Sequence, residues 1–124
     1  MIELAPRTDK LMVEIDRLTF QSTNLVFIIT IDIAPKSTEI KADWNEANLY
    51  CSFLEIDGHR DWRLPTIEEL TQIYNSEHDF IDSYYWSAVE VDGWGAWKQG
   101  MLHGNRGYNS KDSSSYVRAV RSLS

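Results

Sequence analysis

Residues 58–70 carry the sequence GHRDWRLPTIEEL, which joins two segments with helical patterns. Pro65 suits the entry to a helix, Thr66 can act as its N-cap, and Glu69 stands three residues later, which completes a capping box. This pattern predicts a helix that begins after Pro65. Its inner face would carry Ile67, Leu70, Ile73 and Tyr74.

The loop before this helix has two interpretations. In a binding loop, its large side chains would face a ligand. In a structural loop, Trp62 and Leu64 would bury the crossing between the two helices, while Asp61 and Arg63 would hold the loop through charge-assisted hydrogen bonds. We favour the structural interpretation, in which Pro65 also sets the direction of the following helix.

A second capping box marks the helix that precedes the loop. Asp43 can accept a hydrogen bond from the backbone of Glu46, and the Glu46 side chain can reach back to Asp43. Apolar residues recur at helical spacing after this cap, namely Trp44, Ala47, Tyr50, Cys51 and Leu54. We expect this helix to end at Asp57-Gly58, where the chain has turn-forming residues.

Short strands are expected before and after the two helices. The alternating pattern at residues 11–20 and the β-branched run at 25–33 predict an N-terminal hairpin. Its second strand would be an aggregation-prone edge unless it is central in the sheet or buried between subunits. The segments 84–91, 94–102 and 116–121 predict three further strands.

The order of these elements predicts an α+β fold, with two helices packed on a small antiparallel sheet and an N-terminal β-hairpin. We expect a single domain over residues 1–124. Within its last strand, alternation would place Val117 and Ala119 on one face of the sheet, and Arg118 and Val120 on the other.

Length and charge limit the functions open to the chain. Its 124 residues suit one domain, and its net charge of -7 argues against a general nucleic-acid binder. Residues 1–96 hold 18 acidic and 7 basic side chains, whereas residues 97–124 hold one acidic and five basic side chains.

The longest apolar run, at 25–31, is too short to span a membrane. The N-terminus lacks a signal-peptide pattern, which favours a cytoplasmic or virion-associated protein unless the chain is a piece of a secreted one.

The residue patterns do not indicate catalysis, a metal or a cofactor. The histidines His59, His78 and His103 are far apart in the sequence and form no metal-binding pair. Glu77-His78-Asp79 lacks the loop pattern of a calcium site. Cys51 is the only cysteine, so it cannot form an internal disulfide, and no nucleophile stands beside a base in a known motif. We therefore expect a protein that is not an enzyme and has neither metal nor cofactor.

Five motifs are spaced along the chain after residue 40. They are Trp44-x-x-Ala47-x-x-Tyr50-Cys51, Gly58-x-x-Asp61-Trp62-Arg63-Leu64-Pro65-Thr66-x-x-Glu69-Leu70, Tyr85-Trp86-Ser87, Ala96-Trp97 and Val117-Arg118-Ala119-Val120-Arg121. Together they resemble the C-terminal domain family of bacterial collagen-like adhesins. The resemblance spans residues 40–122 and implies a C-type-lectin-like fold. Related folds occur in the variable ligand-binding proteins of diversity-generating retroelements and in formylglycine-generating enzymes.

The chain departs from this family at two places. In the family, the helix cysteine commonly pairs with a cysteine in the final strand, and Ala119 stands at that place here. The resemblance therefore implies that Cys51 serves as a small, buried apolar residue. Residues 1–35 match the family poorly, so the N-terminal hairpin would be an elaboration of this chain.

The candidate binding surface is the glycine-rich C-terminal part of the chain. Residues 103–115 form a long polar stretch, and loops of this length are usually functional or mobile. Trp94 and Trp97 would point to opposite sides of a strand, and Trp97 matches a buried position of the family, which leaves Trp94 exposed. Tyr, Asn and Ser supply the aromatic area and adaptable hydrogen bonds that antibody loops use. The expected ligand contacts are Trp94, Asn105, Arg106, Tyr108, Asn109 and Lys111, beside the run Ser113–Ser115.

These observations favour a noncatalytic recognition module, adhesin-like or phage-receptor-like, that binds a protein or a glycan through this surface. One alternative is a polar, solvated loop without a binding role. Another is an intracellular protein-binding factor of the inhibitor or immunity type, or a self-assembling subunit that forms homo-oligomers through the N-terminal hairpin. Arg118 and Arg121 are expected to pair with acidic residues of the same chain.

Overall fold

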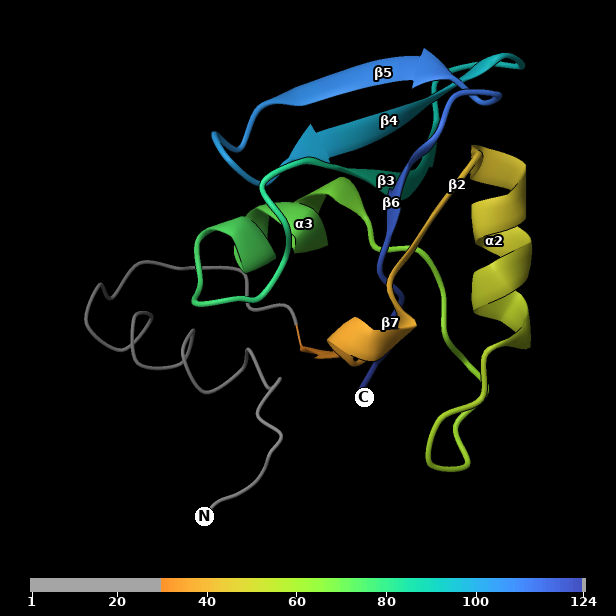
Figure 1. Cartoon of the computed structure of the whole chain (residues 1–124), viewed down its shortest axis with the longest axis vertical. Coiled ribbons are helices and arrows are strands. Elements are labelled where there is room, and N and C mark those ends of the chain that lie inside the picture. Colours follow the sequence, from red (N-terminus) through yellow and green to blue (C-terminus); the bar gives the residue numbers. More distant parts are fainter. Residues whose placement is uncertain (1–29, 124) are drawn as a thin grey trace.

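The computed structural model describes residues 30–123, which form two α-helices, seven short strands and one turn of 3-10 helix (Figure 1). The α+β class predicted from the sequence is confirmed. Neither helix in this part of the chain has the length and hydropathy that crossing a bilayer requires. In chain order the elements are β1 (Ile31–Ile33), the 3-10 helix (Lys36–Thr38), β2 (Ile40–Ala42), α2 (Trp44–Phe53), α3 (Ile67–Tyr74), β3 (Tyr84–Glu90), β4 (Gly95–Gly100), β5 (Arg106–Ser110), β6 (Ser115–Val117) and β7 (Val120–Ser122).

The strands form one sheet of five strands and one of two. In the larger sheet the order is β2-β6-β3-β4-β5, and neighbours run antiparallel except β3 and β6, which run parallel. The larger sheet is therefore mixed, whereas the sequence predicted an antiparallel one. The reason is that the chain leaves β5 at the edge of the sheet and returns beside β3 instead of continuing the antiparallel series.

The N-terminal hairpin predicted over residues 11–33 lies mostly outside the described residues, and so does the oligomer interface expected there. Its last three residues do form a strand, β1. The partner of β1 among the described residues is β7, with Ile31 opposite Ser122 and Ile33 opposite Val120. An antiparallel strand pair therefore joins the two ends of the described chain. No local sequence pattern predicts this pairing.

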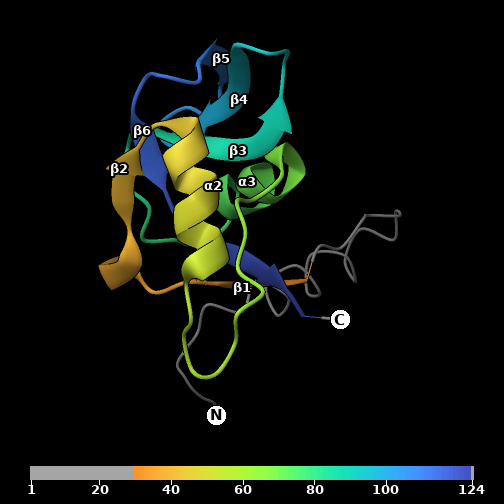
Figure 2. The same cartoon turned by 90° about the vertical axis from the view of Figure 1, so that its right-hand side faces the viewer.

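The two helices pack against opposite faces of β3. Tyr85 belongs to a buried cluster that contains Leu70 and Ile73 of α3. The next residue, Trp86, belongs to a second cluster that contains Ala47 and Cys51 of α2. Successive side chains of a strand point to opposite sides, so one helix covers each side. Figure 2 shows α2 next to β2, and α3 beneath β3 and β4.

Both predicted capping boxes are confirmed. The Asp43 side chain accepts from the N–H of Glu46 at 2.8 Å, and the N–H of Asp43 donates to the Glu46 carboxylate at 3.2 Å. Thr66 and Glu69 exchange the same pair of hydrogen bonds at 3.1 and 2.9 Å. These local bonds satisfy N–H groups at the helix starts, which explains why the sequence located the starts of both helices correctly.

The end of α2 was predicted four residues too late. The helix ends at Phe53, and Leu54 is extended and packs against the second cluster. Asp57 and Gly58 instead form a tight turn in the following loop, with φ values of 54° and 82°. Residues with positive φ therefore mark this turn rather than the helix end.

Two predictions in the C-terminal part were also wrong. Residues 103–115 were expected to form a loop, but they contain the strand β5. Residues 116–121 were expected to form one strand, but they divide between β6 in the larger sheet and β7 in the smaller one. Because the chain changes sheets here, alternation breaks down, and four consecutive residues are buried, namely Val117, Arg118, Ala119 and Val120.

Cys51 lies on the buried side of α2 with a relative exposure of 1%. It belongs to the same apolar cluster as Ala119, the residue that stands where the family commonly has the partner cysteine. Burial raises the pKa of the Cys51 thiol to about 12. The side chain is therefore protonated at neutral pH and packs as a small apolar group.

We expect Cys51 in the folded chain to resist alkylation at neutral pH, because the thiolate is the reactive form and burial suppresses it. A matched control is the double variant Cys51→Ser with Ser52→Cys, which moves the thiol to an exposed position on the same helix. Mass spectrometry should show labelling of native Cys51 about a hundredfold slower than that of the control thiol. Equal rates would contradict the buried position of Cys51.

Candidate functional site

Three aromatic side chains gather at the β4–β5 end of the larger sheet, and we call Trp94, Trp97 and Tyr108 the aromatic face. Trp97 and Tyr108 lie directly opposite each other on β4 and β5. The Tyr108 ring centre is 5.2 Å from that of Trp97 and 6.2 Å from that of Trp94, and the edge of one ring meets the face of the other in both pairs. Trp94 is 54% exposed and Tyr108 is 53% exposed. The aromatic face therefore leaves a large apolar area open to a ligand.

The expectation that Trp94 and Trp97 point to opposite sides of a strand was wrong, since Tyr108 contacts both. Trp94 precedes β4 and lies in a turn, where the Asp92 carboxylate accepts from the N–H groups of Trp94 and Gly95 at 2.9 and 3.0 Å. Alternation applies only within a strand, so it does not fix the direction of Trp94. Trp97 is half-buried rather than in the core, which adds it to the candidate site.

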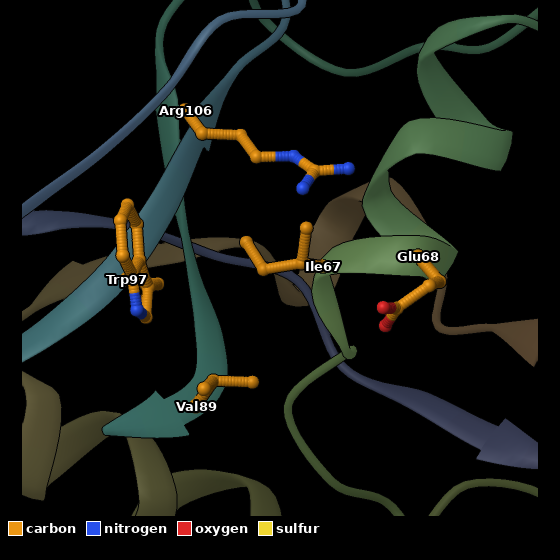
Figure 3. Close-up of a pocket in the computed structure, with 5 residues that line it drawn as sticks. All are labelled: Ile67, Glu68, Val89, Trp97 and Arg106. Carbon is orange, nitrogen blue, oxygen red and sulfur yellow. The ribbon is translucent and has the colours of Figure 1, made fainter. Parts of the chain in front are cut away.

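An open pocket of about 230 Å³ adjoins the aromatic face. Figure 3 shows Trp97 and Arg106 on one side of it, and Ile67 and Glu68 at the start of α3 on the other, with Val89 near the end of β3. Ile67, Val89 and the Trp97 ring supply apolar walls. Arg106 and Glu68 place one positive and one negative group at the rim. The sequence had placed Ile67 on the inner, core-facing side of the helix. It gave no signal that Glu68 or Val89 belongs to a site.

Arg106 differs from the other arginines of residues 30–123. Those four, Arg60, Arg63, Arg118 and Arg121, each form an ion pair with a carboxylate. Arg106 forms none among the described residues, and its guanidinium donates only a long hydrogen bond of 3.3 Å to the Thr71 hydroxyl. Its charge is therefore available to an acidic group of a ligand.

The structure does not bring the other three expected contacts to the aromatic face. The Asn105 amide bonds to the Tyr84 hydroxyl. Lys111 pairs with the Glu90 carboxylate at 2.5 Å, and its ammonium lies 4.8 Å from the Trp44 ring centre. Asn109 alternates with Tyr108 along β5, so it points to the opposite side of the sheet. The structure therefore assembles Trp94, Arg106 and Tyr108 of the six, and adds Trp97.

The Asp-Trp-Arg-Leu-Pro loop forms a structural clamp, as its sequence suggested. Arg63 donates two hydrogen bonds to the Glu69 carboxylate, at 2.8 and 2.9 Å, and exchanges backbone hydrogen bonds with Val120. Burial alone would raise the pKa of Glu69, but the hydrogen bonds from Arg63 and from the Thr66 backbone outweigh it and keep this pKa below its usual value. The same loop presents Asp61, whose carboxylate accepts from Arg121 at 2.7 Å.

Arg118 is the centre of a buried polar cluster. Its side chain is 1% exposed and donates hydrogen bonds to the carboxylates of Glu39 and Asp79, at 3.0 and 2.6 Å, and to the backbone oxygen of Ala34 at 2.6 Å. The guanidinium also lies 4.6 Å from the Phe80 ring centre. Arg118 therefore joins three segments that are distant in sequence, which confirms that it pairs with acids of the chain.

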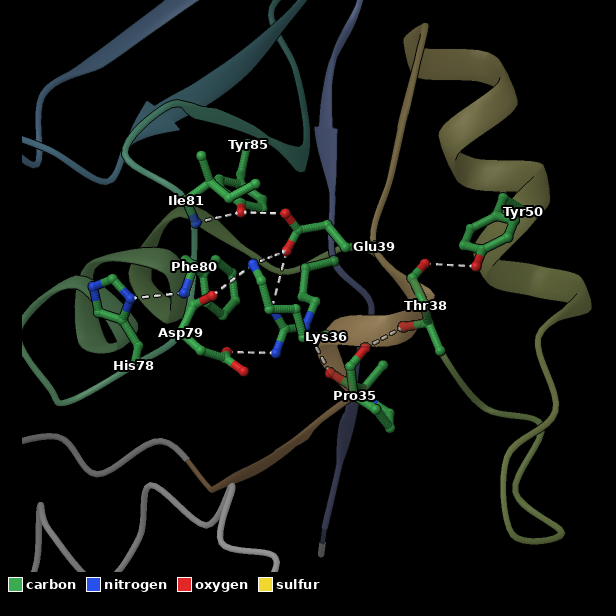
Figure 4. Close-up of polar contacts among 12 residues, drawn as sticks. Pro35, Lys36, Thr38, Glu39, Tyr50, His78, Asp79, Phe80, Ile81 and Tyr85 are labelled. Carbon is green, nitrogen blue, oxygen red and sulfur yellow. Dashed lines mark hydrogen bonds and ion pairs between the residues drawn. The ribbon is translucent and has the colours of Figure 1, made fainter.

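The surroundings of Glu39 complete this cluster (Figure 4). The Tyr85 hydroxyl donates to Glu39 at 2.7 Å and accepts from the N–H of Ile81 at 2.8 Å. Lys36 donates to the backbone oxygen of Asp79 at 2.9 Å and lies 3.6 Å from the Glu39 carboxylate. Burial, followed by the hydrogen bond to Glu39, raises the pKa of the Tyr85 hydroxyl well above its usual value. The contacts are internal, so this cluster stabilises the fold and is not part of the candidate site.

Comparison with known families gives a match over most of the chain. The family model described as the Lcl C-terminal domain matches residues 18–121. The match takes in both helices and begins at residue 18. The expectation that residues 1–35 match the family poorly was therefore wrong for residues 18–35. Curated proteins gave no match to the chain.

Replacing Arg118 by Met should lower the free energy of unfolding by about 3–5 kcal/mol, because the buried Glu39 would lose its closest counter-charge and keep only the more distant, half-exposed Lys36. The matched control is Arg60→Met, since Arg60 forms an exposed pair with Glu55 whose loss should cost no more than about 1 kcal/mol. Urea denaturation followed by circular dichroism measures both changes. Similar values for the two variants would show that the buried cluster adds nothing beyond a surface ion pair.

Replacing Trp94 by Ala should change the free energy of unfolding by less than about 1 kcal/mol, because the ring is exposed and few contacts are lost. Trp86→Ala is the contrasting variant: this ring is fully buried and donates to the backbone oxygen of Ala42, so its loss should cost about 3–5 kcal/mol. The same urea titration compares them. A large loss of stability in Trp94→Ala would mean that Trp94 serves the fold instead of a ligand.

Proposed function

Because the chain belongs to the Lcl C-terminal domain family, we propose that it is a noncatalytic, adhesin-like recognition module that binds a protein or glycan ligand through the aromatic face. Family membership supports the general role. The exposure of Trp94 and Tyr108, beside an Arg106 that forms no ion pair with a described residue, is the observation that supports this location.

The composition of the site matches that of strong binding surfaces. Trp, Tyr and Arg are the residues whose loss most often weakens a protein interface, and they act best when clustered. Tyr108 lies between the two tryptophans and makes edge-to-face contacts with both, which restrict the positions of the three rings. A ligand therefore meets a surface that loses little side-chain freedom on binding.

The pocket limits what can enter the site. Its volume of about 230 Å³ is below the range of about 300–1,000 Å³ that is typical for pockets enclosing a whole small molecule. It can admit one side chain or part of one sugar ring, while the rest of the ligand lies over Trp94 and Tyr108. Arg106 and Glu68 would then orient the polar groups of the bound part.

Trp94→Ala and Tyr108→Ala should each weaken ligand binding about tenfold or more, because each removes a large aromatic contact surface. The ligand can be sought in parallel with a glycan array and a displayed peptide library, and its dissociation constant measured by calorimetry for each variant. Phe53→Ala is the matched control, since Phe53 is an exposed aromatic residue on α2, away from the site. Loss of binding in Phe53→Ala, with full binding in the other two, would place the ligand on α2 instead.

A further inference from the structure

Strand β5 is an edge strand of the larger sheet. It pairs with β4 on one side, and no described strand pairs with it on the other. Figure 1 shows β5 at the outer border of the fold, with no described helix or strand beyond it. An edge of this kind presents backbone N–H and C=O groups that another extended chain can use.

The hydrogen-bond pattern shows which of these groups are free. The N–H of Gly100 donates to the oxygen of Asn105, and the N–H of Lys111 donates to the oxygen of Trp94. Hydrogen-bonded pairs alternate along an antiparallel ladder, so Gly107 and Asn109 exchange bonds with β4. The backbone groups of the intervening residues, Arg106, Tyr108 and Ser110, point away from β4.

Ser110 does not offer its groups to a partner. Its N–H donates to the Asn109 side chain at 2.8 Å, and its oxygen accepts from the N–H of Ser113 at 3.0 Å and from the Ser113 hydroxyl at 2.7 Å. Within residues 30–123, the part of the edge without backbone partners therefore consists of Arg106 and Tyr108. These are also the residues of β5 whose side chains form the pocket rim and the aromatic face.

We propose that an extended peptide segment of a partner protein pairs antiparallel with β5 through the backbone groups of Arg106 and Tyr108. This proposal rests on the proposed function and specifies its ligand as a polypeptide. Residues directly opposite in a ladder project to the same side of the sheet. The peptide residue opposite Tyr108 therefore packs an apolar or aromatic side chain on the aromatic face, and the residue opposite Arg106 is acidic.

Charge complementarity favours such a partner over a second copy of this chain. Arg106 is the arginine of the described residues that lacks an acidic partner. If two β5 strands paired symmetrically about Gly107, Arg106 of one copy would lie opposite Tyr108 of the other and would still lack a carboxylate. A peptide with an acidic residue two positions after an aromatic one meets both requirements.

The first experiment uses the capped peptide Ac-Gly-Thr-Phe-Thr-Glu-Thr-Gly-NH2 as the probe, with Phe expected opposite Tyr108 and Glu opposite Arg106. Amide hydrogen exchange by NMR follows the full chain with and without saturating probe. The amides of Arg106 and Tyr108 should exchange about tenfold more slowly in the complex. Those of Gly107 and Asn109 should change little, because β4 already protects them.

Backbone-modified probes separate strand pairing from side-chain contact alone. N-methylation of Phe and Glu removes the N–H groups that would pair with β5 and should weaken binding about tenfold or more. N-methylation of the Thr between them is the matched control, since its N–H points away from β5, and it should have little effect. Replacing Glu by Gln in the probe should weaken binding to the natural chain, and Arg106→Gln should abolish that difference.

Three results would overturn the proposal. They are the absence of binding by the probe, binding without protection of the Arg106 and Tyr108 amides, and equal losses for both kinds of N-methylated probe. Protection of these amides that grows with protein concentration in the absence of probe would assign the edge to a second copy. The proposed function is tested separately in each case. Its test is whether Trp94→Ala and Tyr108→Ala weaken binding of the ligand that the glycan array or the peptide library identifies.

Discussion

The segment Val117–Arg121 is the constraint on which the rest of the fold depends. Its first four residues are buried, it passes from one sheet to the other, and it bonds to three distant parts of the chain. Arg63 and Val120 exchange backbone hydrogen bonds at 2.8 Å, and the N–H of Ala34 donates to Ala119 at 2.9 Å. The Arg118 side chain then reaches Glu39 and Asp79. These bonds fix the loop before α3, the start of the described chain and the segment before β3 against a common element.

The fold therefore has two different ends. One end, which we call the base, is held together by buried ion pairs, and the other carries the aromatic face. The base contains the Arg118 ion pairs and the two-stranded sheet β1-β7, and the charged side chains there bond to internal partners. At the other end, β4 and β5 project beyond α3 and carry the aromatic face. Gly95 shows how closely these two strands approach, because a Cβ added there would lie 3.1 Å from the backbone oxygen of Asn109. The close pairing of β4 and β5 places Trp97 and Tyr108 side by side, and α3 supplies the opposite wall of the pocket beside them.

Local features were predictable from the sequence and long-range ones were not. Both capping boxes depend on residues three apart, so Asp43 and Thr66 located their helices correctly. The strand β5 was missed because Arg-Gly-Tyr-Asn-Ser has the composition of a loop and lacks the alternation of a half-buried strand. Trp94 was misplaced because the Asp92 turn, not strand geometry, fixes its direction. Of the candidate site, the sequence found Trp94, Arg106 and Tyr108, but it assigned Trp97 to the core and gave no signal for the pocket walls from α3 and β3.

The hydrogen bonds that close the Ser110 end of β5 also bear on the behaviour of the protein at high concentration. Asn109 and Ser113 occupy the backbone groups of Ser110, so the free edge stops after Tyr108. A ladder of that length suits a short guest segment but gives too few bonds to hold many copies in a continuous stack. This edge of the larger sheet therefore offers few backbone groups on which a fibril could grow.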